Sequence, residues 1–259
     1  RRTGIEPVPD DIDIEDLIVE EDNVITVTHQ GYVKRLAVDT YKSQKRGGRG
    51  IIGLSTKEED FISNMFVSST HAHIMFFTNK GKMYRIKAYE IPEAGRHAKG
   101  TPIINILAIE PDERISAVIP VRQYEEGKSL LMCTRAGVIK KTDLMEYSNA
   151  PKAGKIAIRL DDEDELIGVA MTSGNDDIFV GSHEGKVIRF NENDVRSMGR
   201  VSRGVRAMTV SDTDYIIGMC IAREGGKLLT ISENGYGKKT DISEYKVQNR
   251  GGKGMMTYR

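Results

Sequence analysis

The sequence predicts an all-β protein built as a propeller-like ring of four-stranded blades. Three observations lead to this fold class: a hairpin motif recurs about every 50 residues, further strand-like runs flank each hairpin, and no segment shows a convincing amphipathic helix pattern. The composition agrees, because 26 glycines and no tryptophan suit many short strands joined by turns. One small sheet cannot bury both faces alone, whereas stacked blades can.

The hairpin is the first element of each repeat. It consists of a β-rich run that ends in Thr or Ser, two variable residues, a glycine, and a second run that ends in a basic residue. The glycine supplies the positive φ that a short turn requires. Successive turn glycines are 50, 56, 48 and 50 residues apart, at Gly31, Gly81, Gly137, Gly185 and Gly235.

Further strands flank the hairpins. Strand-like runs precede four of them, at residues 61–68, 115–121, 166–172 and 215–222, and segments such as 101–106 follow. Four strands in about 50 residues are typical of a propeller blade, in which the stacked sheets leave only short edges. The expected unit is therefore a four-stranded sheet, repeated along the chain.

The domain organisation follows from the repeat. We expect residues 1–15 to be a linker and residues 16–259 to form one propeller-like domain. Five hairpins are visible and a sixth unit would begin near Thr257, so either the ring is open or the last blade is absent from this chain. No apolar run approaches the roughly 18 residues of a membrane span, and the N-terminus lacks the apolar segment of a signal peptide. Cys133 and Cys220 lie in apolar runs, which predicts buried thiols in a reducing cytoplasm.

A basic seven-residue loop begins 13 residues after each turn glycine. The five loops are residues 44–50, 94–100, 150–156, 198–204 and 248–254. Counted from the turn glycine, three positions are basic in all five repeats. They are position 15 (Arg46, Arg96, Lys152, Arg200 and Arg250), position 18 (Arg49, Lys99, Lys155, Arg203 and Lys253) and position 4 on the hairpin strand (Arg35, Arg85, Lys141, Arg189 and Lys239).

This pattern has two explanations. Duplication of one ancestral repeat can leave solvated loop charges behind, or the cations can form a ring on one rim that binds a polyanion. The second is favoured, because the residues between the cations diverge while the charge persists and Lys exchanges with Arg, as a contact to phosphate allows. The 38 basic and 38 acidic residues balance, and the acidic runs at residues 20–22, 58–60 and 161–165, together with Asp212 and Asp214, fall elsewhere in the period. We expect these runs to be solvated loops rather than a metal site, which leaves a positive perimeter.

One loop carries a specific resemblance. Gln44-Lys45-Arg46-Gly47-Gly48-Arg49-Gly50 resembles the gyrase A box, the signature heptad of bacterial DNA gyrase A subunits, and it stands in the first repeat, as in that family. Residues 248–254 are nearly as good a match, which we interpret as a contact of the fifth blade. The resemblance extends over almost the whole chain, from about Asp16 to Tyr258.

The resemblance implies a six-bladed β-pinwheel in which neighbouring blades exchange strands. It implies a domain that wraps duplex DNA in one handed sense, so that ATP-driven strand passage introduces negative supercoils. The implied partners are double-stranded DNA and the remainder of gyrase A with gyrase B in an A2B2 enzyme, in the nucleoid-associated cytoplasm and without a membrane. We expect the isolated domain to be monomeric. The catalytic tyrosine, Mg²⁺ and ATP belong to other parts of the enzyme, so we expect no catalytic residue, cofactor or metal here.

The sequence leaves three alternatives. The equivalent domain of topoisomerase IV resembles this chain but usually has an eroded heptad. A propeller that binds protein partners would use aromatic and apolar residues on a flat face, whereas aromatics make up only 6 % of this chain. An enzyme on a propeller scaffold is disfavoured, because only His71 and His73 are grouped among the histidines and the sequence has no nucleophile elbow, P-loop or zinc spacing.

Overall fold

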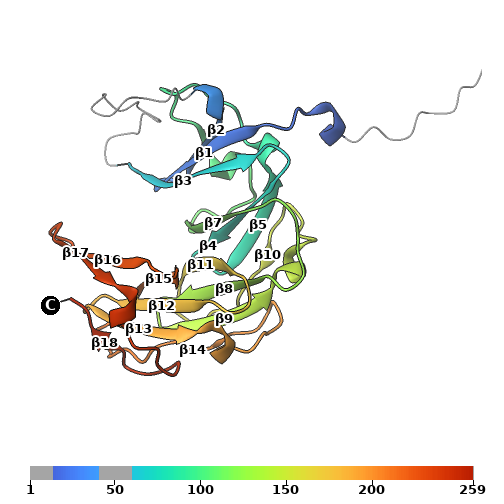
Figure 1. Cartoon of the computed structure of the whole chain (residues 1–259). Helices are drawn as coiled ribbons and strands as arrows, with labels where there is room; N and C mark the ends of the chain where they lie inside the picture. The colour runs from blue at the N-terminus through green and yellow to red at the C-terminus, as the bar shows by residue number, and fades with distance from the viewer. Residues whose placement is uncertain (1–13, 41–59, 259) are drawn as a thin grey trace, which may run out of the picture. The chain divides into compact units, whose positions relative to one another are not determined.

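The computed structural model describes residues 14–40 and 60–258, and these residues confirm the all-β, four-stranded architecture (Figure 1). They divide into two compact units, the first comprising residues up to His73 with 86–106 and the second comprising 74–85 with residues from 107 onward. Every helix of the described residues is a short 3-10 segment, and none of them could cross a membrane. They are η1 (Ile14–Leu17), η2 (Val38–Thr40), η3 (Ala88–Glu90), η4 (Ile103–Asn105), η5 (Leu144–Tyr147), η6 (Glu192–Asp194) and η7 (Ile242–Glu244).

The first unit contains one four-stranded sheet. Its order is β3 (Ile62–Ser69), β1 (Asp22–Thr28), β2 (Tyr32–Ala37) and β6 (Thr101–Pro102). All pairs are antiparallel, and β1 with β2 is the predicted hairpin around Gly31, whose φ is +82°. The two outer strands, β3 and β6, come from the second repeat, so one sheet is built from two repeats.

The second unit repeats this plan three times. Its four-stranded sheets are β10 (Lys155–Ile156), β5 (Lys82–Lys87), β4 (His73–Thr78) and β7 (Ile115–Val121); β11 (Leu166–Thr172), β8 (Ser129–Thr134), β9 (Val138–Asp143) and β14 (Val205–Arg206); and β15 (Ile216–Ala222), β12 (Asp177–Ser182), β13 (Lys186–Asn191) and β18 (Met255–Met256). The fifth hairpin, β16 (Lys227–Ile231) with β17 (Gly237–Asp241), forms a two-stranded sheet. The strand exchange between neighbouring repeats therefore recurs in both units.

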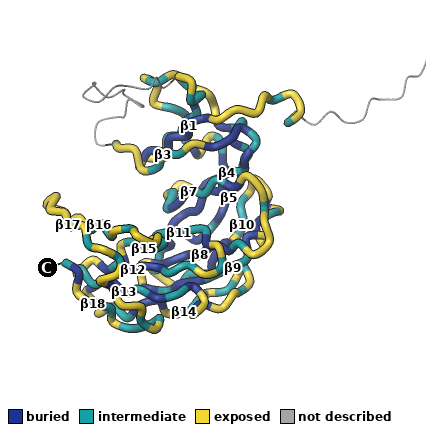
Figure 2. The backbone as a smooth tube through the Cα atoms, viewed as in Figure 1, coloured by how far each residue is buried: buried dark blue, intermediate teal, exposed yellow. Residues whose placement is uncertain are grey.

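Stacking of the sheets creates the core of the second unit. All six residues of β8 are buried, because this strand has a neighbouring sheet on each side (Figure 2). Leu130 and Met132 pack with Met75 and Phe77 of the preceding sheet, while Leu131 and Cys133 pack with residues of the following sheet. The apolar run that contains Cys133 is thus buried on both faces, whereas Cys220 on β15 is exposed, so that prediction was wrong for the second thiol.

The expected strand limits agree with the structure to within one residue, apart from one segment. Residues 101–106 were predicted as a strand, but β6 has only two residues and is followed by the 3-10 helix η4. The reason is its partner: β6 pairs with Tyr32 and Val33 only, where β2 itself begins. Beyond that point the Ile103 N–H donates to the Gly31 carbonyl and the chain turns.

Candidate nucleic-acid interface

Each described basic loop runs from a 3-10 helix to a short strand at the edge of a sheet. The loops 94–100, 150–156, 198–204 and 248–254 lead into β6, β10, β14 and β18. Each of these is an edge strand of its sheet. Each edge strand pairs with the hairpin of the preceding repeat. The heptad 44–50, including Arg46 and Arg49, lies outside the described residues.

Glycines close these loops against the preceding hairpin. Gly204 has a φ of +102°, and a Cβ added to it would lie 2.6 Å from the carbonyl oxygen of Ile139 on β9. Gly100 has the same relation to Val33 of β2, with a φ of +87° and 2.6 Å. A side chain at either position would be strained and would collide with backbone, so glycine is needed for the loop to reach the strand.

Neighbouring loops of the second unit touch one another. The Arg200 guanidinium donates to the carbonyl oxygen of Ile156, at the end of the preceding loop. In the next pair, the Nη1 atom of Arg250 donates at 2.8 Å to the carbonyl oxygen of Arg206, on β14 directly after loop 198–204. The Gly251 N–H also donates to the Ala207 carbonyl at 2.7 Å. The last three loops therefore follow one another along a continuous edge.

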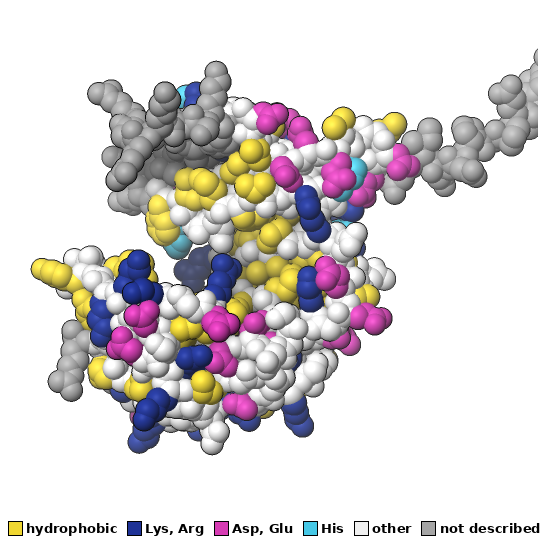
Figure 3. Space-filling view, viewed as in Figure 1, with side chains coloured by type: hydrophobic (Ala, Val, Ile, Leu, Met, Phe, Trp, Pro, Cys, Tyr) yellow, Lys and Arg dark blue, Asp and Glu magenta, His cyan; other side chains and the backbone are white. Residues whose placement is uncertain are grey.

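The cations at positions 15 and 18 lie at the surface of these loops. Lys99, Lys152, Arg203 and Lys253 are exposed, and Arg96, Lys155, Arg200 and Arg250 are partly exposed. Arg203 forms an ion pair with Asp161, and Lys155 donates to the carbonyl oxygen of Asn149. Lys and Arg side chains project along the lower margin of the second unit in Figure 3. The described loops thus present cations that a solvated polyanion can reach.

Position 4 is built differently from positions 15 and 18. The Arg35 side chain, 17 % exposed, donates through Nε to the Ile91 carbonyl at 2.8 Å and lies 3.7 Å from Glu93. Arg85 donates to the carbonyl oxygen of Ser148. Both acceptors follow the 3-10 helix of the next repeat, so these cations hold that helix in place.

The same arrangement recurs in the third and fourth repeats. Arg189 forms an ion pair with Asp177 at 2.7 Å and donates to the carbonyl oxygens of Ile242 and Tyr245, at either end of η7. Lys141 forms an ion pair with Glu192, the first residue of η6. Lys239 on the fifth hairpin is exposed. The predicted DNA contact of position 4 stays a prediction, and four of its five residues already have partners inside the chain.

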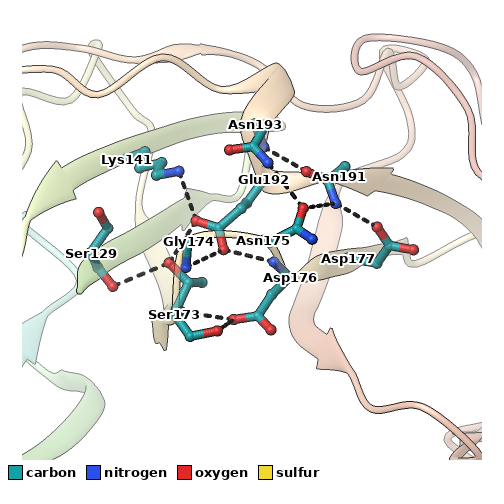
Figure 4. Close-up of polar contacts among 11 residues, drawn as sticks. Ser129, Lys141, Ser173, Gly174, Asn175, Asp176, Asp177, Asn191, Glu192 and Asn193 are labelled. Atoms are coloured by element: carbon teal, nitrogen blue, oxygen red, sulfur yellow. Dashed lines mark hydrogen bonds and ion pairs between the residues drawn. The ribbon is translucent and has the colours of Figure 1, made fainter. Parts of the chain in front are cut away.

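Among the carboxylates that pair with a position 4 cation, Glu192 accepts the most hydrogen bonds (Figure 4). One oxygen accepts the N–H groups of Gly174 and Asp176 at 2.9 and 2.8 Å, and the other accepts the Thr172 hydroxyl and the Lys141 ammonium at 2.9 and 2.7 Å. Burial alone would raise the pKa of Glu192, but these donors outweigh it and lower that pKa below its usual value.

Buried lysines at position 3 were missed by the sequence reasoning. Lys34 is 1 % exposed, and its Nζ atom donates to the carbonyl oxygens of Gly95, Arg96 and Ala98 at 2.9, 2.9 and 3.1 Å. Lys140 is fully buried and donates to those of Ala157 and Arg200. Burial lowers the pKa of both lysines, that of Lys140 to about 7. The available signal was a lysine at this position in three of five repeats.

Acidic residues cap the hairpin turns. The carboxylates of Asp60, Asp164 and Asp214 each accept two backbone N–H groups, one from the turn of the preceding repeat and one from the next residue along the chain, which directly precedes a strand. The acidic runs were expected to be solvated loops, and these three members instead have a defined structural role. This places them at the turn end of the sheets, where they anchor the strand that a repeat contributes to its neighbour.

Comparison with known proteins identifies the repeat. The family described as DNA gyrase C-terminal domain, beta-propeller, matches five successive segments, residues 22–69, 72–122, 128–173, 176–219 and 226–259. This chain belongs to the DNA gyrase C-terminal domain family. The DNA gyrase A protein of Clostridium acetobutylicum is 54 % identical over 259 residues, and that of Escherichia coli is 46 % identical over 257 residues. These alignments cover 100 % and 99 % of this chain, but only 31 % and 29 % of those proteins.

Solved structures of this family have the same fold. A DNA gyrase A C-terminal domain superimposes with a TM-score of 0.74 at 29 % identity, covering 92 % of this chain and 78 % of that one. The C-terminal domain of a DNA topoisomerase IV gives a TM-score of 0.78 at 28 % identity, covering 92 % of this chain and 73 % of that one. The fold is thus shared by both groups, and the similarity of sequence to gyrase A proteins confirms the predicted resemblance.

Proposed function

We propose that this gyrase-family domain binds duplex DNA along the edge formed by its basic loops and bends it, so that a complete gyrase can introduce negative supercoils in an ATP-dependent way. The observation that carries this proposal is the continuous run of the last three loops, linked through Arg200 and Arg250. Duplex DNA carries one charge per ~1.7 Å of its axis, so cations that follow an edge are suited to its backbone.

The chemistry of these loops favours phosphate over bases. Their cations are Lys in some repeats and Arg in others, and phosphate recognition tolerates this exchange, whereas bidentate base recognition does not. Bending ~20–30 base pairs by tens of degrees costs of the order of 1–6 kcal/mol. Several simultaneous phosphate contacts offset this cost. Recognition is therefore expected to be directed at the backbone and to depend strongly on salt.

The remaining roles also belong to this proposal. The DNA-binding residues are the heptad 44–50 together with the cations at positions 15 and 18, while those at position 4 contribute through their place beside the loops. The domain itself carries no catalytic group, and strand passage, Mg²⁺ and ATP belong to the rest of gyrase A and to gyrase B in an A2B2 enzyme.

The test measures DNA affinity and plasmid writhe with the whole 259-residue chain. Binding to a linear duplex is followed as a function of salt, and relaxed plasmid is closed by a topoisomerase in the presence of the chain. We expect Lys152→Ala with Lys155→Ala to reduce the slope of log K against log salt by about 0.9 for each phosphate that is no longer neutralised, and to reduce the writhe.

A matched control removes two charges elsewhere. Lys128→Ala with Lys227→Ala removes a partly exposed and an exposed lysine outside the loops, each paired with a carboxylate. This control is expected to behave like the unmodified chain. Binding that does not weaken with salt, or equal losses in the two double variants, would refute the proposal.

A further inference from the structure

We infer that the buried lysine at position 3 of a hairpin fixes the backbone of the next repeat's basic loop and thereby positions that loop's cations for DNA. This inference rests on the proposed function. It assigns Lys34 and Lys140 a positioning role, because neither ammonium group can reach a ligand in solvent.

The first unit shows the arrangement most completely. Three carbonyl groups of loop 94–100, those of Gly95, Arg96 and Ala98, are directed at the Lys34 ammonium. A lysine ammonium has three protons to donate, so these bonds use its whole capacity. With its carbonyls directed inward, the loop leaves Lys99 exposed and Arg96 partly exposed. The shape of the loop thus depends on one buried charge.

The second unit gives an independent example. Lys140 occupies the same position in the third repeat, and its ammonium donates to the carbonyl oxygen of Arg200, inside loop 198–204. A second bond goes to the Ala157 carbonyl at 2.6 Å, just after the preceding loop. This lysine therefore fastens two successive loops, and one of them contains the arginine whose side chain links them.

The second and fourth repeats use the same position without a charge, through Tyr84 and Ile188. A Cβ on Gly154 would lie 2.7 Å from the Tyr84 ring, and one on Gly252 would lie 3.4 Å from Ile188. In the four repeats whose next loop is described, position 3 thus lies against that loop. Where it is lysine, its ammonium donates to carbonyl groups in or beside the loop; where it is Tyr84 or Ile188, a glycine of the loop packs on the side chain.

The test compares Lys34→Met with Lys87→Met in the whole chain. Lys87 is a matched control in the same unit, since its ammonium also bonds a carbonyl, that of His71 at 3.0 Å, and a carboxylate, that of Glu15 at 2.8 Å. Without DNA, we expect amide hydrogens of loop 94–100 to exchange about tenfold faster or more in Lys34→Met, and unchanged in Lys87→Met. Unchanged loop exchange in Lys34→Met would overturn the inference.

DNA binding separates positioning from general stability. The salt slope of Lys34→Met should fall to that of Arg96→Ala with Lys99→Ala, and adding Lys34→Met to that double variant should cause no further loss. A full additional loss would show that Lys34 acts elsewhere and would overturn the inference. If loop exchange accelerates but the double variant binds DNA like the unmodified chain, the proposed function fails at this loop while the positioning role stands.

Lys140→Met repeats the test at a second site, with loop 198–204 as the reporter. Circular dichroism and urea unfolding precede both experiments. Loss of the sheets in both lysine variants would also overturn the inference, because it would show that these lysines hold the blades rather than the loops.

Discussion

Position 4 of the repeat is basic because the 3-10 helix of the next repeat lies against it. Arg35 and Arg189 bind backbone carbonyls there, and Lys141 binds the carboxylate of Glu192. From sequence these cations cannot be distinguished from those of the loops, since all three positions keep their charge in every repeat. The distinction depends on partners that lie about 50 residues further along the chain, in another repeat.

At the residue scale, Glu192 predicts how the stability of the fold depends on pH. Its pKa is lowered in the folded chain, so the unfolded chain binds more protons, and the stabilisation is present above the ordinary value of about 4.3 and lost as pH falls through the folded pKa. We expect Glu192→Gln to cost about 3 kcal/mol at neutral pH, because it leaves the Lys141 ammonium without its carboxylate.

Urea unfolding at a series of pH values checks this. The difference between the unmodified chain and Glu192→Gln should shrink steadily below about pH 4.3. The exposed Glu224→Gln serves as the control and should show little difference at any pH. A gap that stays constant down to about pH 3 would contradict the lowered pKa of Glu192.

At the scale of elements, strands and loops obey different constraints. The strands that form the buried sheets could be predicted from sequence nearly to the residue, because alternation and β-branched composition reflect burial on a pleated surface. Segment 101–106 could not, because the length of an edge strand is set by its partner, here only Tyr32 and Val33. The basic loops were found by their period, whereas the buried lysines beneath them were not, because a lysine in a strand is ordinarily solvated.

The loops give a prediction about glycine. Gly204 and Gly199 both lie in loop 198–204, but only Gly204 has a positive φ and a backbone oxygen within 2.6 Å of its added Cβ, whereas Gly199 has open space. Gly204→Ala is expected to destabilise the chain by about 1–3 kcal/mol, and Gly199→Ala by less than about 0.5 kcal/mol. Urea unfolding of the two variants measures this, and equal stabilities would show that the loop can move away from β9.

At the scale of the whole molecule, the formal net charge is zero, but basic and acidic side chains take different places within the repeat. Lys and Arg gather in the loops at the last strand of each sheet, and Asp60, Asp164 and Asp214 cap the turns. Net charge therefore carried no information about the partner, and the position of each charge within the repeat did. The first heptad, 44–50, carries the most specific resemblance to the family. Because it lies outside the described residues, its role has to be tested by a functional measurement.

Arg46→Ala with Arg49→Ala is the prediction at this scale. Gyrase reconstituted with this double variant should introduce fewer negative supercoils, because it lacks two of the cations that we propose to bind phosphate, while the variant chain keeps its stability to within about 0.5 kcal/mol. Plasmid supercoiling on agarose gels provides the measurement, with Lys128→Ala and Lys227→Ala as the charge-matched control. Unchanged supercoiling in the arginine variant would refute the assignment of this heptad.

Strand exchange has a consequence for inheritance and for protein engineering. A stretch of gene that encodes one sequence repeat does not encode one blade, because the sheet around β1 and β2 is completed only by β3 and β6. A transplantable blade would have to span residues 22–102, about one and a half repeats in length. Duplication or deletion of one internal repeat should nevertheless leave the sheets complete. Each repeat supplies the outer strands of the preceding sheet, and its own hairpin receives outer strands from the following repeat.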